Sequence, residues 1–395
     1  MRCDFVFEGG GAKGMVFVGA QKELERHSLR PRRVVGTSAG AITATLLAAG
    51  YTADEMRDAL GEQENGKPVF ATFMDAPEEE DFTEEDIDDS LTMNLFEEVD
   101  VPFVPGWVQE KIDKRIIAQL MKLPIYRMLF SFIERGGLYA GNAFLAWFKR
   151  KLDEKQPGLA GLTMAQFAQV TESDLSVVAS DTTGKRMLVL NHRTAPNCPV
   201  AWAVRMSMSI PFAWHEVRWR AEWDPYIFLD PHGGDDGVRA HSLAGHIIVD
   251  GGALSNFPID LLTSKAPHVR AVMGDTDPAG APTIGLLIDE TLPVEGAPPP
   301  PADDDEETGI VDDVKRLRTV SRVTRLMNTM MAAHDSRLIR TSEHLICRLP
   351  AETYGTMEFD MTEERRATLI AAGAAAMRAH LDGRPELAIA QGIST

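Results

Sequence analysis

Apolar and polar positions along the first fifty residues predict the order strand, helix, strand, helix. Residues 4–8 are a short apolar run that ends in glycines, which is typical of a strand followed by a tight turn. Residues 12–28 carry apolar positions at helical spacing, 33–36 are a second apolar run, and 38–50 predict a helix of small residues. Because consecutive parallel strands need a crossover between them, this order indicates a βαβ unit and a parallel sheet.

The same kinds of pattern continue through the rest of the chain. Residues 174–191 predict two strands joined by a turn at Thr183-Gly184. We also expect strands at 246–252 and 284–289, and helices at 136–152, 311–340 and 361–382. The sequence therefore predicts an α/β fold.

Composition divides the chain into a main domain and a C-terminal region. We assign residues 1–290 to the main domain and 311–395 to a helical region that packs on its core. Residues 291–310 contain the run GAPPPPADDDEE, which is typical of an acidic, proline-rich loop.

Two segments are expected to interrupt the main domain. Between Asp75 and Asp100, the segment 62–135 has 13 acidic side chains and no lysine or arginine, and its later part is apolar and helical. An acidic loop followed by a helical cap over the sheet fits this pattern, and so does a solvated loop with an ordinary packing helix. Residues 212–246, rich in tryptophan and glycine, predict an extended loop or hairpin.

Overall charge and cysteine content narrow the classes of function. The chain has 40 basic and 59 acidic residues and a net charge of −19, which argues against a nucleic-acid-binding protein. An anionic membrane would repel this chain, so membrane contact would need a local patch. The basic segment 314–331 would supply one unless its helix packs on the core. The three cysteines are far apart, so we expect buried thiols rather than disulfides or a zinc site.

Hydropathy predicts a cytoplasmic protein. The first residues lack the apolar core of a signal peptide, and no stretch of about 18 apolar residues occurs. Peripheral contact with a membrane, and export by a route without a cleavable signal, stay open.

The stretch GGGAKG at residues 9–14 follows a strand and opens a helix, and two interpretations compete for it. It satisfies G-x-G-x-x-G, the turn that binds a dinucleotide pyrophosphate. That turn normally comes with an acidic residue at the end of the second strand. Here the second strand ends in GTSAG, residues 36–40, without an acid. The dinucleotide interpretation is therefore disfavoured.

The other interpretation uses both glycine motifs. GTSAG is a G-x-S-x-G sequence at a strand-to-helix turn, which is typical of a nucleophilic serine, here Ser38. Gly36 and Gly40 would allow the sharp turn. Backbone N–H groups of residues 9–14 would lie on the same side of the sheet and could stabilise an oxyanion. Lys13 adds positive charge there or is a solvated residue, and we favour the solvated position.

A base for Ser38 is harder to find. The histidines, including His215, His246, His344 and His380, lie in contexts typical of structural residues. Asp250 follows an apolar strand and precedes Gly251 and Gly252, so its carboxylate should emerge at a strand end and could serve as the base. A plain turn-forming aspartate is the alternative.

In this order and context, GGGAKG, GTSAG and DGG resemble the motifs of patatin-like phospholipases. The resemblance covers much of residues 1–290 and extends to four further stretches, namely GGLYAGNAFLAWFKRKL, SVVASDTTGKRMLVLN, RMSMSIPFAW and DGGALSNFPID. It implies a three-layer α/β/α fold with a central, mainly parallel sheet. The C-terminal third matches only loosely, so nothing there is carried over.

The resemblance also implies roles for individual residues. Ser38 would be the nucleophile and Asp250 its general base, and Asn256 and Pro258 would shape the turn behind Asp250. The oxyanion hole would be formed by N–H groups of the glycine motif, chiefly those of Gly10 and Gly11, within the set Gly9, Gly10, Gly11 and Gly14.

A Ser-Asp pair of this kind cleaves phospholipid or other fatty-acyl esters during transient contact with a membrane surface. It needs no metal and no organic cofactor. An acyltransferase and a catalytically silent lipid-binding protein remain as alternatives. A partner-activated toxin or defence effector, opened by a protein or small-molecule activator, fits the long inserted segments. The sequence assigns no oligomeric state.

Three secondary assignments follow. Residues 229–237 are acidic and glycine-rich but lack the spacing of a calcium loop, so we expect an ordinary loop. About half of the apolar residues between Met206 and Trp214 should line an acyl groove, and the rest should pack in the core. We expect four aromatic residues to form either a packed cluster in the hairpin or a rim that faces a membrane. These residues are Trp219, Trp223, Tyr226 and Phe228.

Overall fold

The computed structural model describes residues 1–64, 66–82, 90, 121–229, 238–274, 280–299 and 336–388. Most of the acidic part of the predicted insertion lies outside these residues. So do the loop at 230–237, the acidic end of the proline-rich segment and the basic segment 314–331.

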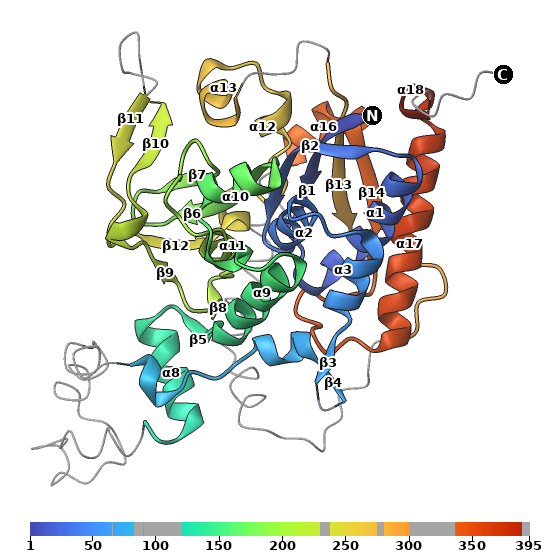
Figure 1. Ribbon diagram of the computed structural model, residues 1–395. Coiled ribbons are helices and arrows are strands. Elements are labelled where there is room, and N and C mark those ends of the chain that lie inside the picture. Colours follow the sequence, from blue (N-terminus) through green and yellow to red (C-terminus); the bar gives the residue numbers. More distant parts are fainter. Residues whose placement is uncertain are drawn as a thin grey trace, which may run out of the picture.

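The centre of the molecule is an eight-stranded sheet in the order β14-β13-β1-β2-β6-β12-β9, with β7 paired to β6 (Figure 1). The five strands from β14 to β6 run parallel, whereas β7, β12 and β9 join by antiparallel pairing. The predicted α/β class with a mainly parallel sheet is therefore confirmed. The strands are β1 (Arg2–Phe7), β2 (Arg30–Thr37), β6 (Asp174–Asp181), β7 (Arg186–Leu190), β9 (Val217–Arg218), β12 (Ile247–Asp250), β13 (Thr283–Asp289) and β14 (Ile346–Pro350).

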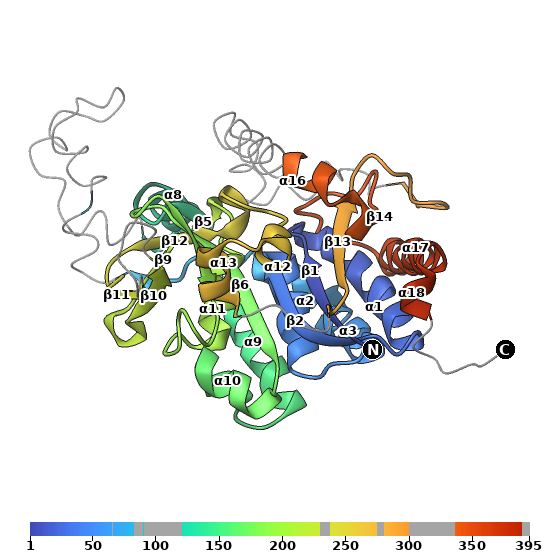
Figure 2. The same cartoon turned by 90° about the horizontal axis from the view of Figure 1, so that it is seen from above.

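Both faces of the sheet are buried, and the alternation of side chains shows it. Phe5 and Phe7 of β1 belong to the larger apolar core, whereas Val6 between them belongs to a second core on the opposite face. A strand buried on both faces has no polar stripe, so the sequence of β1 is a continuous apolar run. Helices cover each face, and the layers are seen together in Figure 2.

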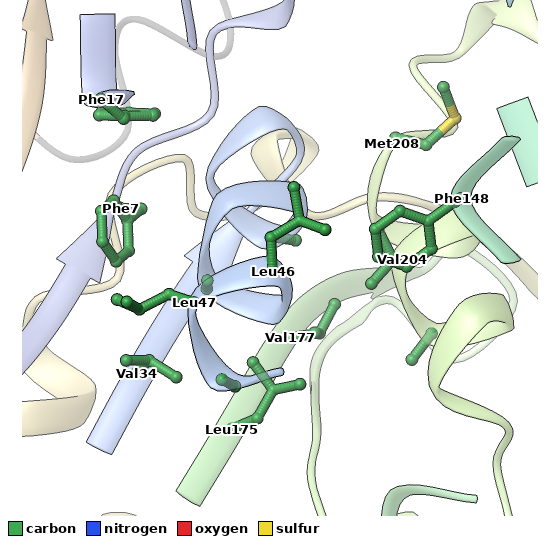
Figure 3. Packing of buried hydrophobic residues seen from close by; sticks show 14 of the residues in the cluster. Phe7, Phe17, Val34, Leu46, Leu47, Phe148, Leu175, Val177, Val204 and Met208 are labelled. Carbon is green, nitrogen blue, oxygen red and sulfur yellow. The ribbon is translucent and has the colours of Figure 1, made fainter. Parts of the chain in front are cut away.

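The larger core lies beneath five helices. Helix α2 packs across the sheet, and Figure 3 shows Leu47 on the side of Phe7 and Val34, with Leu46 on the side of Phe148 and Val204. Helices α1 and α17 lie side by side at the other end of this face (Figure 1). The five helices are α1 (Val16–Arg26), α2 (Ala39–Ala48), α9 (Asn142–Lys155), α11 (Val200–Ser207) and α17 (Glu363–Asp382).

The second core is smaller and has shorter helices. Its residues include Phe257, Ile259 and Leu262, which approach the sheet from the segment after β12. The remaining described α-helices are α3 (Ala53–Leu60), α8 (Pro124–Glu134), α10 (Met164–Thr171), α12 (Asp260–Thr263), α13 (Pro267–Met273), α16 (Ser336–Thr341) and α18 (Pro385–Ala388).

The two inserted segments form local structure at one end of the sheet. Before the undescribed stretch, the 3₁₀ helix η2 (Val69–Phe73) is buried at both ends, and after it α8 packs on β5 (Gly137–Tyr139), which pairs with β8 (Phe212–Trp214). Farther on, β10 (Tyr226–Leu229) and β11 (Val238–His241) form the predicted hairpin.

The aromatic group of this hairpin region is a packed cluster. Trp219, Trp223 and Tyr226 are buried, and the rings of Trp219 and Trp223 meet edge to face with centroids 5.6 Å apart. The interpretation as a membrane-facing rim is therefore wrong for these three side chains.

The C-terminal region is more than a helical layer. Helix α17 packs on α1 as expected, but β14 extends the central sheet beyond β13. The three cysteines, Cys3, Cys198 and Cys347, are free and buried. Across the described residues, no helix has both the length and the apolar character that crossing a bilayer requires.

Candidate active site

Ser38 occupies the turn between β2 and α2, and its backbone is strained. Its φ is 53° and its ψ −121°, which lies outside the regions that non-glycine residues usually adopt. It is buried, being 3% exposed. We call residues 36–40 the serine turn. Strained backbone of this kind is found at functional sites, where the surrounding structure holds it in place.

The glycines of the serine turn are required by close packing. A Cβ atom on Gly40 would lie 2.3 Å from the carbonyl oxygen of Phe7, and one on Gly36 would lie 2.2 Å from that of Gly40. No side chain fits at those distances, so the turn packs directly against the end of β1.

Ser207, the last residue of α11, and Ser209, just after the helix, hold the backbone of the serine turn and of the candidate base. The backbone N–H of Ser38 donates to Ser207 Oγ at 2.9 Å, and Ser207 Oγ donates to the carbonyl of Val178 at 2.6 Å. The N–H of Asp250 donates to the carbonyl of Ser209 at 2.8 Å. One short segment therefore fixes the backbone of both residues.

Asp250 ends β12 and is fully buried. Its Oδ1 accepts the N–H of Gly252 at 2.7 Å, whereas its Oδ2 is buried without a hydrogen-bond partner. Gly251 packs against the carbonyl of Val178, where a Cβ would lie 2.4 Å away. One carboxylate oxygen is thus held by its own turn, and the other is open to a donor.

Burial raises the pKa of Asp250 from 3.8 to about 7, although the Ser38 side chain and the Gly252 N–H act to lower it. Ser38 thus lies beside the carboxyl, yet no hydrogen bond of ordinary geometry reaches Oδ2. Catalytic pairs of this kind often tighten only when substrate binds. The two predicted residues are brought together, with the carboxyl tuned toward neutral pH.

The motif at residues 9–14, here called the glycine loop, passes beside Ser38. The N–H of Gly9 donates to the carbonyl of Asn256 at 3.0 Å, and that of Ala12 to Thr356 at 2.9 Å. Among the described residues, the N–H groups of Gly10 and Gly11 have no such partner. Of the predicted set, Gly10 and Gly11 therefore remain as the available donors.

The other loop residues have packing roles. A Cβ on Gly14 would lie 2.8 Å from that of Ala39, so Gly14 provides close contact with the serine turn. Asn256 Nδ2 donates to the carbonyl of Gly9 at 3.0 Å and so braces the loop from the turn behind Asp250.

The favoured solvated position of Lys13 is wrong. Its side chain is buried and forms an ion pair with Glu290, which lies just after β13 and is itself exposed. A lysine in the first turn of a helix usually reaches water, but here the chain after β13 covers it.

An apolar pocket opens beside Ser38. Met208, Ile210 and Trp214 line it, whereas Met206 lies in the core and Phe212 is exposed. About half of the apolar residues of this segment thus line the pocket, as expected, but Phe212 does not pack in the core, and the use of the pocket for an acyl chain stays a prediction. The other lining residues are Gly11, Ala12, Gly14, Met15, Ala39, Ile42, Thr43, Leu60, Phe70, Phe73, Phe144 and Phe359.

Several of these contributors had no sequence signal of function. Phe70 and Phe73 come from η2, and Phe359 comes from the segment between β14 and α17. The same segment supplies Thr356, which does not line the pocket but accepts the Ala12 N–H. Their place depends on tertiary packing rather than on a motif. Of the histidines, His246 contacts Asp181 at 2.9 Å and His215 contacts Ser131, so both are engaged away from Asp250.

Comparison with known proteins identifies proteins that are similar to this chain in sequence and in structure. A relative from Bacillus subtilis strain 168, the uncharacterized protein YqhO, is 29% identical over 381 residues, which covers 94% of this chain and 96% of that protein. Among solved structures, VipD from Legionella pneumophila has a TM-score of 0.42 at 17% identity, with 96% of this chain and 67% of that chain covered.

The type III effector protein ExoU of Pseudomonas aeruginosa has a TM-score of 0.40 at 14% identity. The match covers 97% of this chain and 53% of ExoU, so this chain spans about half of that protein's length. Residues 5–263 match the family described as patatin-like phospholipase. Since this match takes in well over half of the chain and includes the turns of both Ser38 and Asp250, the chain belongs to the patatin-like phospholipase family.

Proposed function

We propose that this protein is a serine acyl hydrolase that cleaves fatty-acyl esters of phospholipids through an acyl-Ser38 intermediate. The observation that carries the proposal is the pairing of a strained, buried serine with a buried aspartate whose Oδ2 lacks a partner. Family membership supports the same class of substrate.

In the first step, Asp250 Oδ2 takes the proton of the Ser38 hydroxyl as Ser38 Oγ attacks the ester carbonyl. The carbonyl oxygen becomes an oxyanion, and the N–H groups of Gly10 and Gly11 stabilise it. A well-placed donor of this kind contributes about 3 kcal/mol to the transition state. The tetrahedral intermediate then collapses, the bond to the alkoxy oxygen breaks, and Asp250 returns the proton to the departing alcohol.

In the second step, Asp250 takes a proton from water, and the resulting hydroxide attacks the acyl-Ser38 carbonyl. Collapse breaks the bond to Ser38 Oγ, which regains the proton, and the fatty acid leaves. Since burial raises the pKa of Asp250 to about 7, the ionised form that accepts protons prevails above neutral pH. The apolar pocket would take the acyl chain, and transient contact with a lipid surface would supply the substrate.

The test is fatty-acid release from phospholipid in mixed micelles, measured by mass spectrometry. Wild type, Ser38→Ala and Asp250→Asn are compared with Ser173→Ala as a matched control. Ser173 immediately precedes β6 and so lies at the opposite end of the sheet from the serine turn.

We expect release by wild type and Ser173→Ala, and a loss of at least about a thousandfold in both site variants. A fluorophosphonate should label wild type and Ser173→Ala covalently, and it should not label Ser38→Ala. Release by Ser38→Ala at the wild-type rate would refute the proposal.

A further inference from the structure

The pocket beside Ser38 is small for a phospholipase substrate. Its volume is about 40 Å³, and its lining is almost entirely apolar. On a comparable scale, an apolar cavity of roughly 150 Å³ holds one benzene ring. On that scale, about 25 Å³ per carbon, the pocket has room for only about one or two carbons beyond the reacting carbonyl. A long chain enters only if part of the wall moves.

Among the aromatic side chains of the wall, two are less completely buried than the others. Of the five aromatic side chains that line the pocket, Phe73, Phe144 and Trp214 are at most 2% exposed. Phe70 is half-buried, and Phe359 is 9% exposed. Moving a partly exposed ring disturbs fewer contacts than moving one that is enclosed on every side.

Phe70 and Phe359 are far apart in the sequence, but their rings are in contact within the pocket wall. Their ring centroids are 6.3 Å apart in an edge-to-face arrangement. Phe359 contacts Trp214 at 5.7 Å, and Phe70 contacts Trp147 at 5.6 Å. A pair of this kind adds stabilisation beyond simple burial, so the contact holds the wall closed while it exists.

The backbone under both rings is neither sheet nor long helix. Phe70 lies on the short 3₁₀ helix η2, and Phe359 lies in the irregular segment between β14 and α17. Segments of this type open locally at lower free energy than the core elements that carry Ser38 and Asp250. Phe359 also lies beyond residue 263, so this half of the pair is outside the part of the chain that matches the family.

We propose that the Phe70–Phe359 contact sets the acyl-chain length that this protein accepts. Esters with short acyl chains fit the pocket as it stands, and longer chains react only when the two rings separate. The inference rests on the proposed hydrolase function and assigns the chain-length selectivity of the same site to this pair.

The experiment measures kcat/KM for monomeric p-nitrophenyl acetate, butyrate and octanoate. Wild type is compared with Phe70→Ala, with the milder variant Phe70→Leu, and with Phe228→Ala. Phe228 is a matched control because it is also partly buried, but it lies in β10 and does not line the pocket. Circular dichroism confirms that each variant is folded.

For wild type, we expect kcat/KM to fall at least about tenfold between acetate and octanoate, because the acyl chain of octanoate is longer than the pocket can hold. Phe70→Ala should reduce this ratio by about tenfold, Phe70→Leu by less, and Phe228→Ala should keep the wild-type ratio. The measured quantity is the ratio between esters, so a general change in activity does not affect it.

Equal kcat/KM for acetate and octanoate in wild type would overturn the inference. So would an unchanged ratio in folded Phe70→Ala and Phe70→Leu. Either result, obtained with turnover that depends on Ser38, leaves the hydrolase function intact. Absence of Ser38-dependent turnover with every ester and with phospholipid micelles would instead refute the proposed function, and this inference with it.

Discussion

The serine turn and the glycine loop flank the same reacting centre but are held in place differently. The serine turn is fixed from within the family-matched part of the chain, by the end of β1 and by Ser207. The glycine loop is fixed in addition by Thr356, far along the chain, whose carbonyl accepts the Ala12 N–H. The proposed nucleophile thus depends on core packing, whereas the proposed oxyanion donors depend partly on a C-terminal segment.

The serine turn and the glycine loop should therefore respond differently to substitution. A side chain added at Gly40 must disturb the sheet, because it would meet backbone atoms at the end of β1. A change in the glycine loop can be absorbed by movement of an irregular segment. The first kind should reduce stability and activity together, and the second should reduce activity more than stability.

The largest effect is expected for Gly40→Ala. Alanine normally favours a helix over glycine, but here the new Cβ would meet the Phe7 carbonyl oxygen at 2.3 Å and that of Glu8 at 2.6 Å. We expect a loss of about 3 kcal/mol or more in unfolding free energy, measured by urea denaturation, together with loss of fluorophosphonate labelling.

Gly11→Ala is the counterpart in the glycine loop. Gly11 has a φ of +56°, and a Cβ there would lie 2.1 Å from the Thr356 carbonyl oxygen. We expect a loss of only about 1–2 kcal/mol, with a much larger fall in turnover. Gly161→Ala is the control, since a Cβ there meets nothing within 4 Å. Equal destabilisation by Gly40→Ala and Gly11→Ala would contradict the comparison.

Asp250→Asn tests how the buried carboxyl of Asp250 changes the free energy of unfolding with pH. Its pKa of about 7 in the folded protein lies above the value of about 3.9 expected in the unfolded chain. The folded state therefore binds the proton more tightly. The stability that this proton provides is fully present below pH 4 and is lost as the pH rises through 7.

The asparagine variant cannot ionise, so its stability relative to wild type should increase with pH. Between pH 5 and pH 8 the difference in unfolding free energy should move by about 2–3 kcal/mol in favour of Asp250→Asn. Urea denaturation at both pH values measures it. A difference independent of pH would mean that Asp250 has an ordinary pKa.

The smallest effect on activity is expected for Ser207→Ala. The substitution leaves the buried N–H of Ser38 without its acceptor, which costs about 1–3 kcal/mol. Fluorophosphonate labelling of Ser38 should slow by about tenfold, because the strained turn loses a support. Ser209→Ala is the comparison, since Ser209 holds Asp250 through its carbonyl, which the variant keeps. Slower labelling in Ser209→Ala than in Ser207→Ala would contradict this role.

The parts of the site that were predictable from sequence are those in which one residue and its neighbours carry the information. The apolar run of β1, the turn around Ser38 and the position of Asp250 at a strand end all depend on local patterns. Because β12 runs antiparallel to β6, strand order alone does not bring the end of β12 to the end of β2. The register does so, since Asp250 pairs with Ala179 and Thr37 pairs with the adjacent Val178.

The remaining features depend on contacts between distant segments. The burial of Lys13 requires the chain after β13 to cover it, and the pocket wall at Phe359 requires β14 to pair with β13. Phe359 stands in no pattern typical of function, and the motif around Lys13 does not indicate whether its side chain is buried. Pairing between strands far apart in sequence decides such positions, and a single chain's periodicity does not report it.

The extra strand at the edge of the sheet has a practical consequence for protein engineering. A fragment cut at the ends of the family match, residues 5–263, would omit β13 and β14 and would leave β1 with an unpaired edge next to the glycine loop. Exposed edges of this kind promote aggregation. A minimal catalytic fragment should therefore extend through α17, to Asp382.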